Sequence, residues 1–337
     1  MQIIDKIQFF SVIILSFFLI QCKGFKSNQD NLVTPSEVTS PTTNPITPEK
    51  IALGKMLFFD PRLSGSNWIS CATCHNPSLG WSDGLPKGLG HGMQKLGRNS
   101  PTIINAGFGA LQFWDGRAPS LEEQAKGPIQ SPGEMNQNPE ELVKELKKIP
   151  AYVDLFDKTF PKEGLTFDTI ANAIASFERT VVSKNSPFDK WRSGDATAVN
   201  DSAKRGFDLF NSKAKCILCH QGFNFSDNGF HNIGLKEEEG VVDVGRFEHL
   251  PIKILKGAFK TPTLRDITLS GPYMHNGMYN SLEEVVEHYD RGGDNKENLS
   301  PNISPLGLSE EEKKDLVAFM KTLTGDPITI LVPRLPQ

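Results

Sequence analysis

Two stretches of the chain carry the same three reactive side chains at the same spacing. The first is SCATCHNPSLGWSDG, residues 70–84, and the second is CILCHQG, residues 216–222. Each contains two cysteines separated by two residues, with a histidine directly after the second cysteine. Thiols and imidazoles at this spacing bind metals, form redox disulfides or hold a prosthetic group. The repetition predicts related chemistry at two centres.

The histidine after each cysteine pair favours one of these alternatives. A redox disulfide needs only the two thiols, and a zinc site of four cysteines needs no histidine after both pairs. Attachment of haem c uses all three side chains, because the thiols add across the haem vinyl groups and the histidine binds the iron. We therefore predict two c-type haems as cofactors, with zinc or a disulfide as the alternative. The attachment residues are Cys71, Cys74 and His75 for the first haem and Cys216, Cys219 and His220 for the second.

The fifth cysteine, Cys22, follows a targeting segment. The mostly apolar run from Ile7 to Ile20 is short for a membrane span and typical of a signal peptide. The letters LIQC resemble a lipobox, although Gln21 stands where a small residue is usual. We predict that residues 1–22 are a signal peptide and that Cys22 carries a lipid anchor. An ordinary cleaved signal peptide and an uncleaved anchor are the alternatives. All three export the chain, which predicts an extracytoplasmic, periplasmic location.

Composition adds few restrictions. The 337 residues are 38% hydrophobic and 23% charged, as expected for a globular protein of roughly two domains. A formal net charge of −4 gives no sign of a nucleic-acid partner. Residues 23–47 are rich in Ser, Thr, Asn and Pro, so we predict that they form a flexible tether.

Helical patterns surround both motifs and must position them. Apolar spacing and capping signals predict helices within residues 47–59, 138–150, 167–182, 201–216, 280–293 and 308–325. Long loops rich in Gly and Pro connect them, especially 76–118 and 221–281, and no alternating strand series appears. The order helix, CxxCH, loop, helix occurs in each half. We therefore predict a mostly α fold of two cytochrome c-like domains, residues 48–190 and 191–337.

The remaining axial position of each iron decides between electron transfer and catalysis. An iron with both positions filled transfers electrons, whereas an iron with an open position reacts with small molecules. Candidate ligands outside the motifs are His91, His231, His249, His275, His288, Met93, Met135, Met274 and Met278.

Two longer stretches resemble a known family. Residues 90–136, GHGMQKLGRNSPTIINAGFGALQFWDGRAPSLEEQAKGPIQSPGEMN, are similar to bacterial di-haem cytochrome c peroxidases. Residues 259–293, FKTPTLRDITLSGPYMHNGMYNSLEEVVEHYDRGG, resemble the second domain of that family and of the related MauG enzymes. With both motifs, the resemblance covers roughly residues 48–325. It implies reduction of hydrogen peroxide to water. The electrons come from a small redox protein, a cytochrome c or a cupredoxin; they enter at the C-terminal haem, and peroxide reacts at the N-terminal haem.

The resemblance assigns roles to four residues of the first half. Glu134 matches the distal acid that moves a proton between the peroxide oxygens. Gln124 matches its hydrogen-bonding partner. Trp114 matches the tryptophan between the haems, which shortens the electron route or packs in an apolar interface. His91 matches the histidine that caps the first iron until the second haem is reduced. For Glu134, Gln124 and His91 the alternative is an ordinary loop or helix position away from the iron.

The chain departs from the peroxidases at the second iron. Fourteen residues after His275 the peroxidases have a methionine ligand, whereas this chain has Tyr289, as MauG does. A tyrosine oxygen favours ferric iron and lowers the haem potential, whereas methionine raises it. The predicted helix places four residues on one face: Leu282, Val285, Val286 and Tyr289. The alternative is therefore a core role for Tyr289, with Met274 or Met278 as the ligand.

The resemblance also implies calcium between the domains. The side chain of Asn99 and the backbone carbonyls of Ser270 and Pro272 match the family's ligands. The alternative for Asn99 is an Asx turn before Ser100 and Pro101.

Two further functions remain as alternatives. Tyr289 favours a MauG-like oxidase that uses peroxide to oxidise a protein side chain or another organic substrate. The third function is a non-enzymatic di-haem electron carrier, against which Glu134 and Gln124 argue because a carrier needs no proton shuttle. A homodimer is compatible with the sequence.

Overall fold

The computed structural model describes residues 32–35, 37–236 and 240–337. The predicted signal peptide, the anchor residue Cys22 and the first part of the predicted tether lie outside these residues. Across the described part of the chain, every helix is too short or too polar to cross a membrane.

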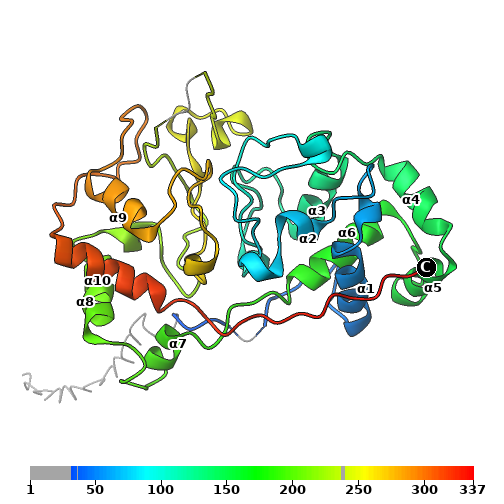
Figure 1. Ribbon diagram of the computed structural model, residues 1–337, viewed down its shortest axis with the longest axis horizontal. Coiled ribbons are helices and arrows are strands. Elements are labelled where there is room, and N and C mark those ends of the chain that lie inside the picture. Colours follow the sequence, from blue (N-terminus) through cyan, green and yellow to red (C-terminus); the bar gives the residue numbers. More distant parts are fainter. Residues whose placement is uncertain (1–31, 36, 237–239) are drawn as a thin grey trace, which may run out of the picture. The chain divides into compact units, whose positions relative to one another are not determined.

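Helices supply most of the regular structure, which confirms the prediction of a mostly α fold (Figure 1). The helices are α1 (Pro48–Phe58), α2 (Cys71–Cys74), α3 (Leu121–Gln130), α4 (Pro139–Lys147), α5 (Pro150–Thr159), α6 (Phe167–Glu178), α7 (Pro187–Arg192), α8 (Asp201–Phe210), α9 (Leu282–Asp290) and α10 (Glu310–Lys321). The strands β1 (Phe230–His231) and β2 (Phe259–Lys260) pair antiparallel in a small sheet.

Side-chain caps begin the later helices where the sequence predicts. The Ser281 hydroxyl accepts a hydrogen bond from the backbone N–H of Glu284, and the Glu284 carboxylate accepts one from the N–H of Ser281. Ser309 and Glu312 form the same reciprocal pair at the start of α10. These capping boxes satisfy backbone donors that the first helical turn leaves free.

Several boundaries differ from the sequence prediction. Helix α8 ends at Phe210 instead of running into the second motif, because Lys215 has a left-handed φ of 56° that an α-helix does not accommodate. Helix α6 ends at Glu178, four residues early. Helix α3 was not predicted, since Gly127 and Pro128 within it are poor helix formers.

The same helix crossing occurs in both halves. In the first half α1 packs on α6, and a Cβ added at Gly54 would overlap the backbone carbonyl of Ala173. In the second half α8 packs on α10, and a Cβ added at Gly206 would overlap the carbonyl of Asp315. Both crossings therefore depend on a glycine, which supports the duplicated unit inferred from the sequence.

Each half has its own hydrophobic core. The first is built around Phe58, Trp81 and Phe177, whose rings pack within 5.2–6.1 Å of one another. The second is built around Phe188 and Phe319, whose ring centroids lie 5.7 Å apart. These are the two predicted cytochrome c-type domains; the boundary at residues 190 and 191 stays a prediction.

Part of the segment expected to be a flexible tether packs on the first domain. Asn44 is only 1% exposed, and its amide donates to the carboxylate of Glu122 at 2.8 Å. Arg179 binds the same carboxylate with both guanidinium nitrogens, at 2.7 and 3.0 Å. Burial alone would raise the pKa of Glu122, but the hydrogen bonds from Arg179 and Asn44 lower it to about 2. Buried contacts of Asn44 and Val38 thus hold part of a stretch whose composition is typical of a linker.

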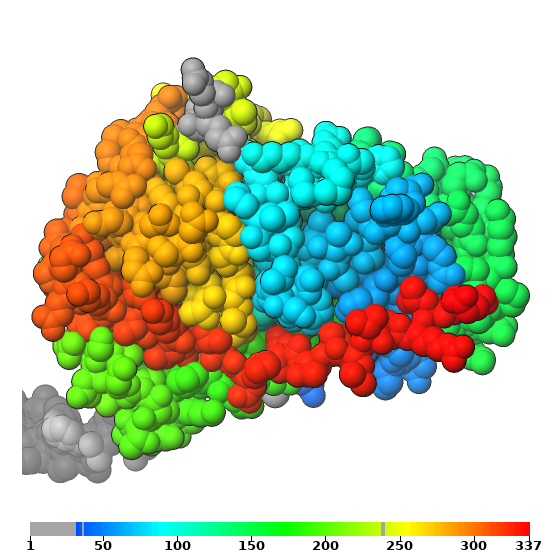
Figure 2. Space-filling view, in the orientation of Figure 1, coloured from blue at the N-terminus to red at the C-terminus, as the bar shows by residue number. Residues whose placement is uncertain are grey.

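The C-terminal segment links the two domains. After α10 it runs along the surface from the second domain to the first (Figures 1 and 2). Ile328 and Ile330 pack against the first hydrophobic core, and Arg62 donates to the carbonyl of Pro336 at 3.0 Å. The chain end of the second domain is therefore part of the surface of the first.

Candidate active site

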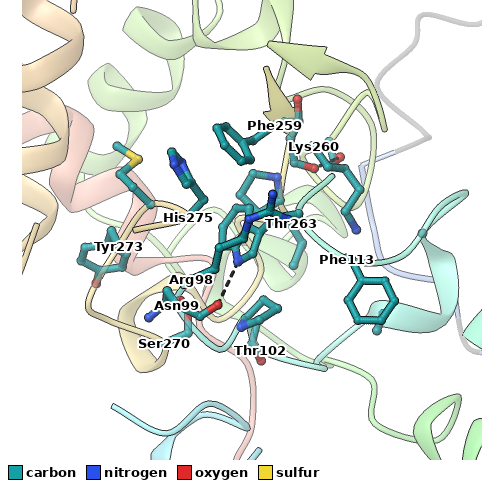
Figure 3. Close-up of a pocket in the computed structure, with 18 of the residues that line it drawn as sticks. Arg98, Asn99, Thr102, Phe113, Phe259, Lys260, Thr263, Ser270, Tyr273 and His275 are labelled. Atoms are coloured by element: carbon teal, nitrogen blue, oxygen red, sulfur yellow. Dashed lines mark hydrogen bonds between the residues drawn. The ribbon is translucent and has the colours of Figure 1, made fainter. Parts of the chain in front are cut away.

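One continuous cavity of about 700 Å³ reaches both cysteine motifs. Its walls include the six motif residues Cys71, Cys74, His75, Cys216, Cys219 and His220. Residues from both domains meet in its middle, where Arg98, Phe259 and His275 lie near one another (Figure 3). The two predicted centres therefore share a single internal space.

Local hydrogen bonds orient the first motif. Cys71 and Cys74 form the short helix α2, and the His75 N–H donates to the Cys71 carbonyl at 2.9 Å. His75 Nδ1 lies 3.3 Å from the backbone oxygen of Trp81, which leaves Nε2 for another partner. Burial lowers the pKa of His75 and so keeps the neutral form that binds iron.

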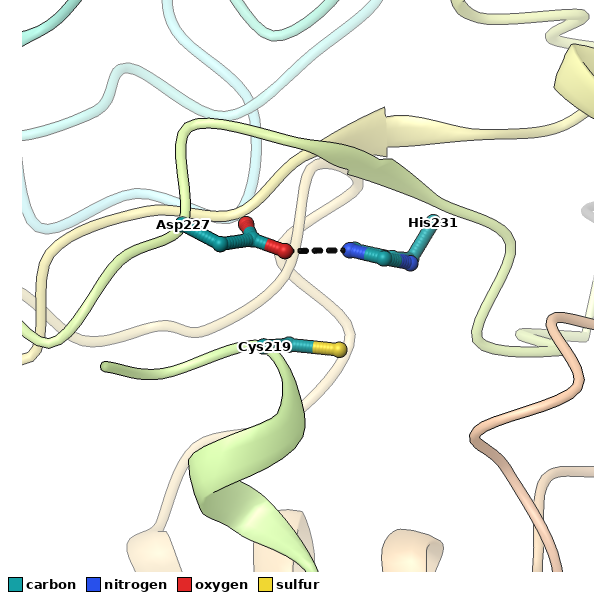
Figure 4. Close-up of side chains that lie close together, drawn as sticks. All are labelled: Cys219, Asp227 and His231. Carbon is teal, nitrogen blue, oxygen red and sulfur yellow. Dashed lines mark hydrogen bonds and ion pairs between the residues drawn. The ribbon is translucent and has the colours of Figure 1, made fainter. Parts of the chain in front are cut away.

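The second motif repeats this arrangement. His220 Nδ1 lies 2.8 Å from the backbone oxygen of Phe225, and burial lowers the pKa of His220. Beside it, the Asp227 carboxylate lies 2.8 Å from His231 Nε2, close to the Cys219 sulfur (Figure 4). A backbone carbonyl thus selects the same free imidazole nitrogen in both motifs.

The cavity fits two haem c groups. All four motif cysteines are free thiols, as attachment to vinyl groups requires. The exposed lining is mainly apolar, and one buried polar atom of a lining residue, Glu178 Oε2, lacks a hydrogen-bond partner. Buried polar atoms are normally satisfied, so this one is consistent with a partner that a cofactor brings.

The predicted distal residues converge from separate segments. Gln124 lies on α3 and Glu134 lies in the loop after it, and both line the cavity. His91 lies next to Glu134, since its backbone N–H is shared between the carbonyls of Gly133 and Glu134 at 3.1 and 2.7 Å. A Cβ added at Gly90 would overlap the Gly133 carbonyl, so this approach requires glycine. The His91 side chain itself is not part of the cavity wall, whereas Gly90 is.

Trp114 lies where the two domains meet. Its indole N–H donates to the Asn99 carbonyl at 2.9 Å, and its own carbonyl accepts from the Lys260 N–H at 2.8 Å. Its ring meets that of His275 edge to face, with centroids 6.5 Å apart. Trp114 is therefore held by both domains inside the shared cavity.

The structure separates the candidate ligands of the second iron. The four residues of the predicted α9 face, Leu282, Val285, Val286 and Tyr289, all line the cavity. Burial, followed by the neighbouring Cys216 and Cys219, raises the pKa of Tyr289. Met274 also lines the cavity, but Met278 does not. Tyr289 and Met274 thus remain as candidates on geometric grounds.

The predicted calcium residues lie together. Asn99, Ser270 and Pro272 all line the cavity, although Asn99 comes from the first domain and the other two from the second. The Asn99 amide nitrogen donates to the Leu85 carbonyl at 2.9 Å, which turns the side-chain oxygen away from that contact.

Several ionisable residues of the cavity were not predicted from the sequence, among them Glu178 and Lys260. Glu178 is 5% exposed, and burial raises its pKa to about 8. Lys260 points into the cavity from β2, and burial lowers its pKa to about 8. Each follows a phenylalanine in sequence, and no periodicity signals that the charged neighbour faces inward.

Comparisons with known proteins agree with this geometry. Residues 48–197 match the family of di-haem cytochrome c peroxidases, and residues 203–324 match the cytochrome c family. The chain is 49% identical over 305 residues to the methylamine utilization protein MauG of Methylorubrum extorquens. This match covers 90% of this chain and 86% of that protein. It is 40% identical over 309 residues to the cytochrome c551 peroxidase of Pseudomonas aeruginosa, with the same coverage of 90% and 86%.

A solved structure is similar over most of the chain. The crystal structure of a MauG-like protein associated with microbial copper homeostasis is 32% identical, with a TM-score of 0.80. The match covers 87% of this chain and 95% of that one. The diheme peroxidase BthA from Burkholderia thailandensis, at 22% identity and a TM-score of 0.73, shares the fold.

Proposed function

We propose that this chain, which belongs to the di-haem cytochrome c peroxidase and MauG family, reduces hydrogen peroxide to water with electrons from a small redox protein. The observation that carries the proposal is that Glu134 and Gln124 both line the cavity, with Glu134 near Cys74 of the first motif. A carrier that only transfers electrons needs neither residue. The reaction consumes two electrons and two protons for each peroxide.

Two haem c groups would supply the redox chemistry. Cys216 and Cys219 would hold the haem that receives electrons, and Cys71 and Cys74 would hold the haem at which peroxide reacts. His75 and His220 would bind the two irons through Nε2, the nitrogen that their backbone contacts leave free. Trp114, held by both domains, lies on the route between the centres.

Glu134 performs the proton transfer in this proposal. It accepts the proton from one peroxide oxygen and returns it to the leaving oxygen, which departs as water. Gln124, on the neighbouring wall, donates a hydrogen bond that orients the peroxide. The apolar remainder of the wall excludes bulk water, which strengthens these polar interactions.

The Glu134→Gln variant tests this function. It keeps the shape of the side chain but removes the proton acceptor, so peroxide turnover should fall about a hundred- to ten-thousand-fold. Turnover is measured with an artificial electron donor, and the haem absorption spectrum should be unchanged. Glu140→Gln, at an exposed glutamate of α4 that does not line the cavity, is the matched control. Normal turnover in Glu134→Gln would contradict the proposed chemical step.

Tyr289 favours a second candidate function. It stands on the cavity wall at a position where the sequence resembles MauG, and this supports peroxide-dependent oxidation of a protein side chain or another organic substrate. The two functions differ in their products. A peroxidase oxidises two donor molecules per peroxide, whereas the oxidase consumes peroxide with covalent change to its substrate, which mass spectrometry of the added protein detects.

Location and calcium complete the proposal. An exported chain anchored through a lipid at Cys22 would meet its donor outside the cytoplasm, and release of the Cys22→Ser variant from membranes tests the anchor.

Calcium would bind between the domains at Asn99, Ser270 and Pro272. Chelation should then lower turnover in the wild type but not in Asn99→Ala, which would already be impaired.

A further inference from the structure

Lys260 differs from the other cationic side chains that line the cavity. Arg98 pairs with Asp115 and Asp243, and Arg117 pairs with Asp115. Lys215 donates to the Ser304 hydroxyl. The ammonium of Lys260 has no hydrogen bond or ion pair with any residue that the structure describes, and its side chain extends into the cavity (Figure 3).

The backbone around Lys260 is held on two sides. Its N–H donates to the Trp114 carbonyl of the first domain at 2.8 Å. It pairs with Phe230 in the small sheet, and the next N–H, from Thr261, donates to Gly229 at 2.9 Å. The backbone of Lys260 is therefore fixed at the junction of the domains, and its side chain lines the cavity.

An unpaired ammonium in such a place is unfavourable. Burial lowers the pKa of Lys260 to about 8, because the surroundings disfavour the charged form. Buried charges in proteins are almost always paired with an opposite charge. The described residues supply no carboxylate to Lys260, but each haem c brings two propionate carboxylates into this cavity.

We infer that Lys260 pairs with a haem propionate at the junction of the two domains and acts as a positioning residue that raises the reduction potential of that haem. The inference rests on the two bound haems of the proposed function and not on peroxide reduction. A positive charge near the iron favours the ferrous state, which carries one more electron. Removing it leaves the propionate charge uncompensated and favours the ferric state.

Midpoint potentials of the two haems test the inference. In Lys260→Met the reduction equilibrium of one haem should shift about tenfold toward the ferric state, which is about 59 mV for a one-electron couple. Lys260→Arg should retain the wild-type potential. Lys253→Met removes an equal charge from an exposed site of the same domain and should change neither haem. Potentials in Lys260→Met equal to those of this control would overturn the inference.

A second measurement covers the case in which Lys260→Met does not retain both haems. Resonance Raman spectra report the bending bands of the haem propionates directly. The Lys260→Arg variant keeps the charge but changes its hydrogen-bonding geometry, so the bands of one haem should move while the iron spin state stays the same. Unmoved propionate bands would overturn the pairing. Because peroxide turnover is not a readout, a failure of the peroxidase proposal leaves both tests intact.

Discussion

The backbone around His91 explains why its side chain lies beside the cavity and not in its wall. The two hydrogen bonds from its N–H and the close approach of Gly90 hold this turn against Gly133 and Glu134. The next residue, Gly92, has a φ of 63° and open space around it. A glycine with open space around it leaves room for the turn that carries His91 to change conformation. This suits a histidine that binds the first iron in one state and leaves it in another.

Replacing His91 by Ala should remove a cap and leave the catalytic residues in place. The fully oxidised variant should show high-spin signal at the first haem in EPR spectra and should react with peroxide without prior reduction. The Glu134→Gln variant serves as the contrast, because it loses turnover while its resting spectrum stays that of the wild type. A resting spectrum of His91→Ala identical to wild type would mean that the first iron is already open.

Tyr289 and Met274 are the two candidate ligands of the second iron. One substitution at each residue distinguishes between these two assignments. If the Tyr289 oxygen is the ligand, Tyr289→Met should raise the potential of the second haem and change its axial-ligand spectrum. Met274→Leu should then have little effect on either. The opposite result, a spectral change only in Met274→Leu, would reduce Tyr289 to a core residue.

At the scale of elements, each domain contains a close crossing of two helices, α1 with α6 in the first and α8 with α10 in the second. Gly54 and Gly206 occupy equivalent places in α1 and α8, and in both cases a phenylalanine, Phe177 or Phe319, lies against the glycine. The helices can approach this closely only because neither glycine has a side chain. Helix propensity alone would favour alanine at both positions by about 1 kcal/mol.

Gly54→Ala and Gly206→Ala should therefore destabilise the protein, against the direction of helix propensity. Overpacking at a helix contact costs about 1–3 kcal/mol, and here the added atom meets rigid backbone. Denaturant unfolding of the haem-loaded protein measures the effect as a lower midpoint. Asp208→Ala, at an exposed position of α8, is the control and should not lower the midpoint. A higher midpoint for either helix variant would rule out the close crossing.

At the scale of the whole described chain, an ion-pair cluster joins the two domains beside the cavity. Arg98 of the first domain binds Asp243 of the second through two hydrogen bonds of 2.7 and 2.8 Å. Arg246 of the second domain donates to the carbonyls of Asp115 and Gly116 at 3.0 and 2.7 Å. Burial alone would raise the pKa of Asp243, but Arg98 overcomes this and lowers it.

The sign of the pH effect follows from that lowered pKa. The Arg98–Asp243 pair stabilises the folded protein fully above the ordinary pKa of aspartate, and this contribution is lost as the pH falls through the lower folded value. Arg98→Met should reduce the free energy of unfolding near pH 7 by about 1.5–3 kcal/mol. A double-mutant cycle with Asp243→Asn isolates the pair. Lys144→Met, which breaks the exposed pair with Glu141, should leave the free energy of unfolding nearly unchanged. Zero coupling energy in the cycle would contradict a stabilising role of the Arg98–Asp243 pair.

The sequence alone was sufficient for the cofactor class, the number of centres and the family. Two CxxCH motifs predict two haems because attachment chemistry requires three side chains at a fixed local spacing. Helix positions followed from local periodicity and caps, as at Ser281 and Ser309. The prediction was weaker where a residue opposes its own propensity. Helix α3 contains a glycine and a proline, and the buried Asn44 lies in a stretch with the composition of a linker.

Only the tertiary structure decided what shares a cavity. Glu134, Trp114 and Tyr289 lie far apart in sequence, and they line one space because two domains close around it. The inward direction of Lys260 and Glu178 has no local signal, since burial of a charge depends on what lies opposite it in the fold. Met274 lines the cavity and Met278 does not. This difference likewise depends on the fold of the turn that contains both residues. Local sequence patterns identify functional residues that lie near one another in the chain, whereas contacts between distant residues arise only when the domains pack.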